Sequence, residues 1–152
     1  RGDANARCGR GRYIGWSPTP RVVLALFRAD MSYDLKLEAT PRHLAMTLCG
    51  QMNYEACREA MEVLVTEAAA REFPPILVDL LEMEADLSAT EVFELVDGAK
   101  DSGFGSRSRV AIVGQLRPPF NRLGFAVEIA EHRGLQVQGF RCPDEARAWL
   151  GG

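Results

Sequence analysis

Apolar and polar residues alternate strictly where clear patterning begins in the chain. Residues 33–39 are apolar at every second position, with charged residues between them. This period of two is typical of a strand with one buried and one exposed face. A second apolar run at 43–49 follows the turn-forming pair Thr40-Pro41. We therefore predict that the two runs form an antiparallel hairpin.

A nearly continuous apolar run, ILVDL at 76–80, lies in the middle of the chain. Such a run is typical of a strand that helices cover on both faces, so we predict that it lies at the centre of the sheet. Asp79 stands near its end. Glu82, Glu84 and Asp86 follow, and we expect them to form an acidic loop between this strand and the next helix.

A helix start follows the acidic segment. Ser88 stands three residues before Glu91 and just ahead of the apolar positions Val92, Leu95 and Val96. The serine hydroxyl can accept a hydrogen bond from the Glu91 amide while the glutamate side chain reaches back. This capping box predicts a helix start at Ser88. Ligands and partners of open α/β sheets bind where strands end and helices begin, so we expect a functional site here.

The remaining elements alternate along the chain. Helices are predicted over about 54–68, 88–100 and 120–132 and from Pro143 onward, and strands at 109–113 and 135–140. Strands that alternate with helices imply right-handed crossovers and a mostly parallel sheet. We therefore predict an α/β fold, a mixed sheet of about five strands with an N-terminal antiparallel hairpin and helices packed on the sheet.

Residues 1–30 differ in composition from the rest of the chain. They hold six arginines and no lysine, against Asp3 and Asp30. Their only apolar run, 22–27, is shorter than the ~7–15-residue core of a signal peptide. We expect 1–30 to be a poorly ordered N-terminal extension and 31–152 to form the folded domain. The alternative is a basic arm that contacts an acidic partner.

Charge and cysteine content narrow the function classes. Outside residues 1–30 the chain has twelve basic and nineteen acidic residues, which argues against nucleic acid as a partner, because such binding depends on basic groups. No apolar run approaches the ~20 residues of a membrane-spanning helix. The four cysteines form no CxxC or Cys/His cluster. We expect reduced thiols in a cytoplasmic protein, with no metal site and no cofactor.

Several segments within about 32–150 carry a family resemblance: ILVDL, DLSATEVFEL, RVAIVG, FAVEIAEHRGLQVQGF and DEARAWL. Together they resemble the sulfate-transporter/anti-sigma-factor-antagonist (STAS) family, in particular its small stand-alone bacterial members. In the family, a strand ending in aspartate precedes a helix start whose hydroxyl is phosphorylated by a partner anti-sigma kinase. Asp79 and Ser88 stand at the matching positions. The family's Asp-Ser-Ser/Thr-Gly segment is DLSAT here, at 86–90.

Residues 79–94 leave three questions open, each with two answers. Ser88 is either a phosphoacceptor or only the helix cap. Glu82, Glu84 and Asp86 either form a solvated loop or hold a divalent metal ion in an enzyme with Asp79 as nucleophile. The first helical turns form a partner surface or an ordinary exposed face. The candidate residues for binding a partner or ligand are Asp79, Glu82, Glu84, Asp86, Thr90, Glu91, Phe93 and Glu94.

The resemblance implies a regulatory signalling domain that binds proteins and has no enzymatic activity. Its expected partner is an anti-sigma factor or kinase, with phosphorylation of Ser88 as the control. The alternative comes from another class of protein. It is a small-ligand domain that holds a nucleotide or a lipid in the crevice beyond Asp79.

Overall fold

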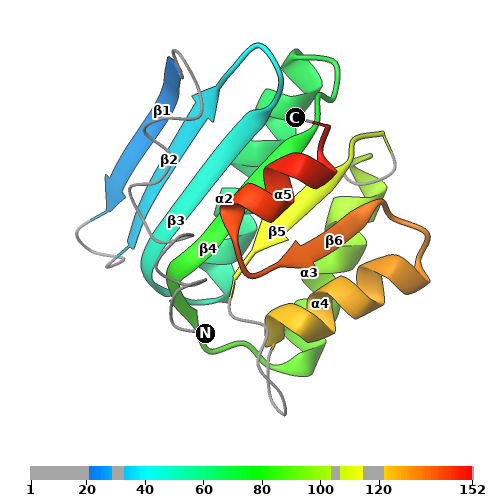
Figure 1. Cartoon of the computed structure of the whole chain (residues 1–152). Helices are drawn as coiled ribbons and strands as arrows, with labels where there is room; N and C mark the ends of the chain where they lie inside the picture. Colours follow the sequence, from blue (N-terminus) through cyan, green and yellow to red (C-terminus); the bar gives the residue numbers. More distant parts are fainter. Residues whose placement is uncertain (1–20, 29–32, 104–106, 115–121, 152) are drawn as a thin grey trace, which may run out of the picture.

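The structure is a computed structural model that describes residues 21–28, 33–103, 107–114 and 122–151. Within these residues a six-stranded sheet has its strands in sequence order (Figure 1). The strands are β1 (Arg21–Arg28), β2 (Tyr33–Ala39), β3 (Leu44–Met52), β4 (Ile76–Ala85), β5 (Val110–Val113) and β6 (Val137–Phe140). The β1–β2 and β2–β3 pairs are antiparallel, and the pairs from β3 to β6 are parallel. The predicted mixed sheet with an N-terminal hairpin is confirmed.

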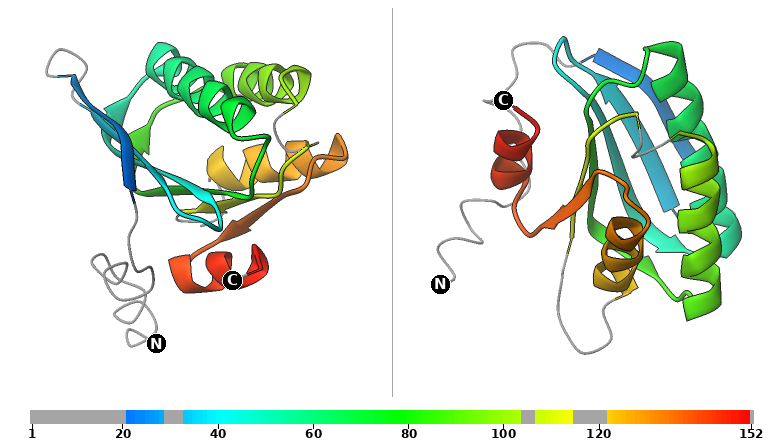
Figure 2. Two further views of the ribbon diagram at one scale, coloured as in Figure 1. Left: turned by 90° about the horizontal axis from the view of Figure 1, so that it is seen from above. Right: turned by 90° about the vertical axis from the view of Figure 1, so that its right-hand side faces the viewer.

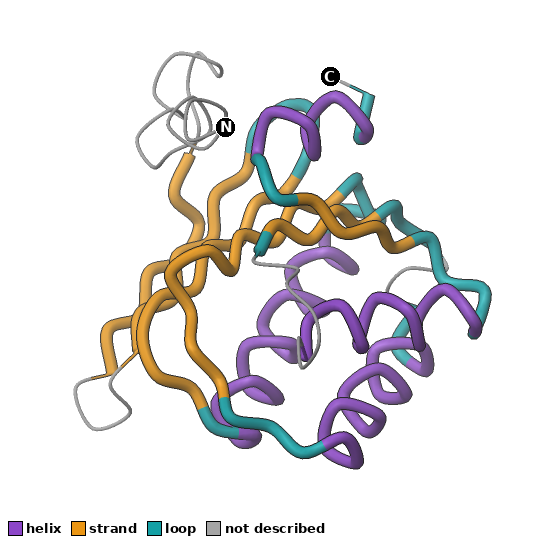
Figure 3. The backbone as a smooth tube through the Cα atoms, turned by 60° about the horizontal axis from the view of Figure 1, so that its bottom comes forward, coloured by secondary structure: helices purple, strands orange, loops and turns teal. Residues whose placement is uncertain are grey.

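Helices cover the two faces of the sheet unequally (Figures 2 and 3). One face carries α2 (Tyr54–Ala70), α3 (Ala89–Asp101) and α4 (Arg122–His132), with α3 in contact with both of the others. The short helix α5 (Pro143–Trp149) packs on the opposite face, against β4, β5 and β6. The helices lie close to their predicted ranges.

The strand β1 corrects the division of the chain drawn from sequence. Residues 21–28 were expected to belong to a poorly ordered extension, but they pair with β2 along its length. Leu24 lies opposite Leu37, and Leu26 lies opposite Leu35. The run is short and flanked by arginines, so it becomes recognisable as a strand only beside its partner. The expectation for residues 1–20 and 29–30 falls outside the described residues.

The apolar run of β4 contributes to two cores. Ile76 and Val78 point into the main core between the sheet and helices α2–α4, whereas Leu77 belongs to a smaller core under α5. Successive side chains of a strand point to opposite faces, so a strand covered on both faces is apolar at every position. The prediction of a strand covered on both faces is confirmed.

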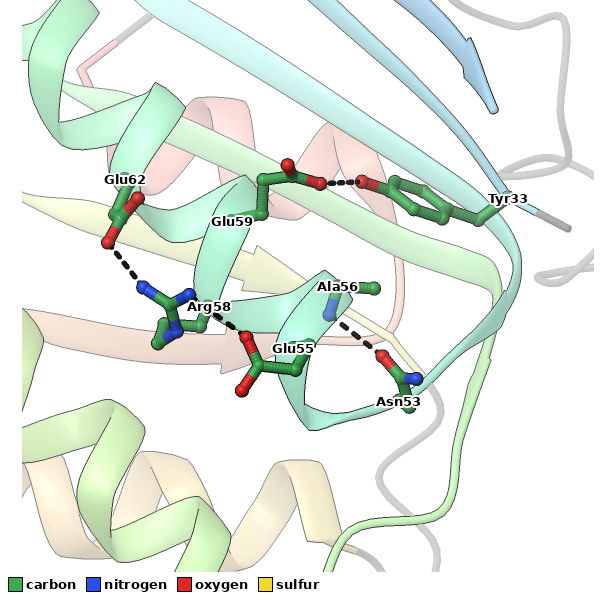
Figure 4. Close-up of polar contacts among 7 residues, drawn as sticks. All are labelled: Tyr33, Asn53, Glu55, Ala56, Arg58, Glu59 and Glu62. Carbon is green, nitrogen blue, oxygen red and sulfur yellow. Dashed lines mark hydrogen bonds and ion pairs between the residues drawn. The ribbon is translucent and has the colours of Figure 1, made fainter. Parts of the chain in front are cut away.

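Side-chain hydrogen bonds cap α2 and join it to the sheet (Figure 4). The Asn53 side chain caps the helix by accepting a hydrogen bond from the Ala56 amide at 2.8 Å. The Tyr33 hydroxyl on β2 donates to a Glu59 carboxylate oxygen at 2.9 Å. The Tyr33–Glu59 bond thus links the hairpin to the first helix of the layer that carries the candidate site.

Cysteine chemistry departs in one respect from the expectation of reduced thiols. Cys49 and Cys57 are free, whereas Cys142 is disulfide-bonded. Scattered cysteines give no sign of such a bond in the sequence, because pairing depends on which segments the fold brings together.

Within the described residues, every helix is too short or too polar to cross a membrane.

Candidate partner-binding surface at the start of α3

The strand β4 is longer than the sequence indicated, and this corrects the expected acidic loop. β4 continues to Ala85, with Glu82 opposite Cys49 and Glu84 opposite Gln51 on β3. The extension forms because β3 also continues, after a register shift between Thr47 and Cys49, so the backbone has a partner. Glu82 and Glu84 are exposed, whereas Met83 between them and Ala85 after them pack against the main core.

The helix start at Ser88 has the predicted capping geometry. The Ser88 hydroxyl accepts a hydrogen bond from the Glu91 amide at 3.1 Å, and the Glu91 carboxylate accepts one from the Ser88 amide at 3.0 Å. The prediction of a capping box is confirmed. Ser88 is exposed, so its hydroxyl lies at the surface. Asp86 is exposed as well, and Leu87 between them is buried.

The exposed side of α3 combines acidic groups with one aromatic ring. We call Thr90, Phe93, Glu94 and Asp97 the α3 outer face, because positions three and four apart share one side of a helix. All four are exposed. Phe93 is 42% exposed and is the one large apolar side chain so exposed in the described part of the chain. The opposite side of α3, with Val92, Val96 and Ala99, is buried in the main core.

A cation from α4 completes this surface. The guanidinium of Arg133, just after α4, lies 4.4 Å from the centre of the Phe93 ring. Its Nε is 2.7 Å from a carboxylate oxygen of Asp97. Sequence reasoning missed Arg133, since a basic residue at the end of a helix is explained by the helix dipole alone. The only available signal was an aromatic residue at an exposed helical position.

The structure separates Asp79 from the other candidates. Asp79 is buried, its carboxylate accepts a hydrogen bond from the Leu81 amide at 3.0 Å, and its neighbour Leu77 faces α5. A strand advances about 3.3 Å per residue, so roughly 20 Å of β4 separates Asp79 from Ala85 at the strand's end. Asp79 therefore faces the α5 side of the sheet, whereas the helices α2, α3 and α4 cover the other face.

Asp79 belongs instead to a buried polar group on the α5 side that sequence reasoning did not assemble. His43, Asp79 and Arg147 are all nearly inaccessible to solvent. Burial lowers the pKa of Arg147, and the carboxylates of Asp144 and Asp79 partly offset this effect. Burial, with the nearby charges of Arg147 and Arg42, lowers the pKa of His43 to about 4. His43 is thus neutral in the fold at physiological pH.

The metal interpretation of the acidic residues finds no cluster to support it. Among the described residues no group of three or more His, Cys, Asp or Glu side chains could hold an ion. Glu82 and Glu84 lie on an extended strand, and Asp79 faces the helix α5. What the structure does bring together is Ser88, Glu91 and the α3 outer face.

Comparisons with known proteins address the fold. Neither a protein-family model nor a curated protein matches the sequence. Among solved structures, the chain is similar to an uncharacterized protein from the DUF3478 family with a SpoIIAA-like fold, from Shewanella loihica PV-4. The identity is 21%, the TM-score is 0.51, and the match covers 82% of this chain and 98% of that one.

Two further solved structures carry functional names. An anti-sigma factor antagonist from Mycobacterium paratuberculosis matches at 16% identity and a TM-score of 0.55, covering 84% of this chain and all (100%) of that one. The anti-sigma factor antagonist SpoIIAA in its unphosphorylated form matches at 15% identity and a TM-score of 0.51, covering 78% and 98%. The chain therefore has the SpoIIAA-like fold, the fold of the STAS family that its sequence resembles.

Proposed function

We propose that this chain is a regulatory domain that binds a protein partner, an anti-sigma factor or kinase, through Ser88 and the α3 outer face. It acts in the cytoplasm by binding rather than by catalysis. The observation that carries the proposal is the exposed Ser88 hydroxyl at a capped helix start, little more than one turn before the exposed ring of Phe93. A SpoIIAA-like fold presents this junction at the end of a parallel strand.

Phosphorylation of Ser88 gives this surface a physical switch. A phosphate at a helix N-terminus gains from free amides and from the helix dipole. Here it also meets the Glu91 carboxylate, which is hydrogen-bonded to the Ser88 amide. Repulsion between the two anions opens the capping box and loosens the first turn of α3, which carries the partner surface.

The chemistry of the surface defines the partner. Phe93 is flanked by Glu94, Asp86 precedes the same helix start, and Arg133 beside the ring is paired with Asp97, so the surface keeps a net acidic character around one aromatic anchor. Buried aromatic anchors supply most of the affinity of typical interfaces, while surrounding charges steer and orient the encounter. The expected partner has an apolar pocket ringed by basic side chains.

Phosphate transfer is tested with the purified chain, ATP and an anti-sigma kinase encoded beside its gene. Peptide mass spectrometry should place one phosphate on Ser88 in the native chain, and Ser88→Ala should take up none. Thr90→Ala, which removes another exposed hydroxyl of the same helix start, is the matched control and should still accept phosphate. Continued labelling of Ser88→Ala would refute the assignment.

The binding surface is tested by calorimetric titration of the same kinase with unmodified chains. Phe93→Ser should weaken binding by about tenfold or more, as expected for an aromatic anchor. Asp34→Ser is the control, since Asp34 is exposed on β2, between residues that face the main core, and so lies on the other face of the sheet. Equal affinities of the native and Phe93→Ser chains would place the partner elsewhere.

A further inference from the structure

A cavity of about 730 Å³ lies between the sheet and the helices α2, α3 and α4. Its walls come from residues distant in sequence, for example Leu48 on β3, Met61 on α2, Leu95 on α3 and Ala130 on α4. Pockets that hold small molecules span roughly 300–1,000 Å³ and are mostly apolar. Both the size and the lining of this cavity fall in that class.

The unequal lengths of the strands show where the cavity lies. β5 pairs with β4 only as far as Asp79, opposite Val113, whereas β4 continues to Ala85 with β3 as its partner. Leu80, Met83 and Ala85 of this longer stretch line the cavity, so it extends along the end of β4 that continues beyond the β5 pairing.

The lining of the cavity defines the kind of ligand. Apart from Glu82 and Glu84, the described lining residues are apolar or, like Cys57, uncharged. Met83 and Ala85 pack against the main core, whereas the Glu84 side chain is hydrogen-bonded to the side chain of Gln51 on β3, so the glutamate carboxylates lie on the other face of the sheet. A ligand with a phosphate or carboxylate group would lose its hydration in such an apolar interior.

We propose that this cavity binds an uncharged, mainly hydrocarbon molecule and that the bound molecule stabilises α3 from the side opposite Phe93. Val92, Leu95 and Val96 line the cavity, while the α3 outer face lies on the other side of the same helix. Filling the cavity orders α3 and so prepares the α3 outer face for its partner. This second part of the proposal, the regulation of partner binding by the ligand, rests on the proposed function, whereas ligand binding itself does not.

Binding is tested with Nile red, a neutral fluorescent dye, on the full chain. Ala60→Leu and Ala130→Leu enlarge two alanines of the lining and should weaken dye binding by about tenfold or more without lowering Tm, because the new side chains occupy empty space. Ala68→Leu is the control, since Ala68 is also buried on α2 but does not line the cavity. It should lower Tm through overpacking and keep the dye.

Equal dye binding by the native chain and both filled variants would overturn the proposal, as would no binding by the native chain. The ligand class is tested by thermal shift. Decanol should raise Tm more than decanoate does, because the apolar interior disfavours the decanoate carboxylate and because only native-state binding stabilises. Equal shifts for both compounds in the native chain would refute the inferred ligand class.

The regulatory half is tested by hydrogen exchange of α3 with and without saturating decanol. Exchange of the amides in 92–99 should slow in the native chain and stay unchanged in Ala60→Leu. If exchange stays unchanged in a native chain that binds Nile red, only the proposed effect of the ligand on α3 is overturned. Phe93→Ser should keep full dye binding. A variant that loses the partner and keeps the dye shows that the cavity and the α3 outer face are separate sites.

Discussion

The guanidinium of Arg133 stacks over the ring of Phe93, with its central carbon 4.4 Å from the ring centre. The same side chain pairs with Asp97 one turn further along α3. Two contacts from the end of α4 thus hold an exposed aromatic ring against its own helix. A ring restrained in this way loses less conformational entropy when a partner covers it.

Replacing Arg133 tests this restraint. Arg133→Met should lower the free energy of unfolding by about 1 kcal/mol, since an exposed cation–π contact contributes roughly 0.5–1 kcal/mol and an exposed ion pair about 0–1. Urea denaturation gives the value. Lys100→Met, at an exposed position in the last turn of α3, is the control and should stay within about 0.5 kcal/mol of the native chain.

Ser88 has a structural role that can be separated from phosphorylation. Ser88→Ala removes the hydroxyl that accepts from Glu91 and should cost about 1 kcal/mol of stability. Ser88→Asn retains a capping side chain and should remain close to the native stability, yet it accepts no phosphate. Comparable destabilisation in both variants, measured by urea denaturation, would contradict the capping role.

Asp79 should matter for stability and not for surface chemistry. Asp79→Ala leaves Arg147 buried with one carboxylate fewer nearby and should lower the free energy of unfolding by about 2–4 kcal/mol. Gln138→Ala, at an exposed position on β6, should change it by less than about 0.5 kcal/mol. A small effect of Asp79→Ala in the same urea experiment would show that the buried polar group is not needed.

His43 predicts a specific pH dependence of stability. Its pKa is lowered from 6.5 to about 4 in the fold, so between these values the unfolded chain binds a proton that the native chain does not. The contribution of neutral His43 to the free energy of unfolding is complete above about pH 6.5. It decreases by roughly 3 kcal/mol in total as the pH falls toward 4.

The pH dependence is measured by urea denaturation at several values between pH 7 and pH 4. In His43→Gln the slope over this range should become shallower, because the titrating group is gone. His132→Gln replaces an exposed histidine at the end of α4 and should leave the slope close to that of the native chain. An unaltered slope in His43→Gln would assign the effect to other groups.

Features set by neighbouring residues could be predicted from the printed sequence. The alternation in β2 and the apolar run of β4 define which faces are covered, and three-residue spacing places Glu91 within reach of Ser88. These patterns were sufficient for the fold class and for the helix start that carries the candidate phosphoacceptor. They depend on backbone geometry that is the same in any protein.

Contacts between distant segments were decided only by the packed chain. β1 became a strand because β2 pairs with it, and β4 grew to Ala85 because β3 is equally long there. The inward direction of Asp79, the position of Arg133 over Phe93 and the cavity behind α3 each join elements far apart in sequence. Local propensity does not encode such pairings, because their free energy comes from burial and hydrogen bonds that exist only once the layers assemble.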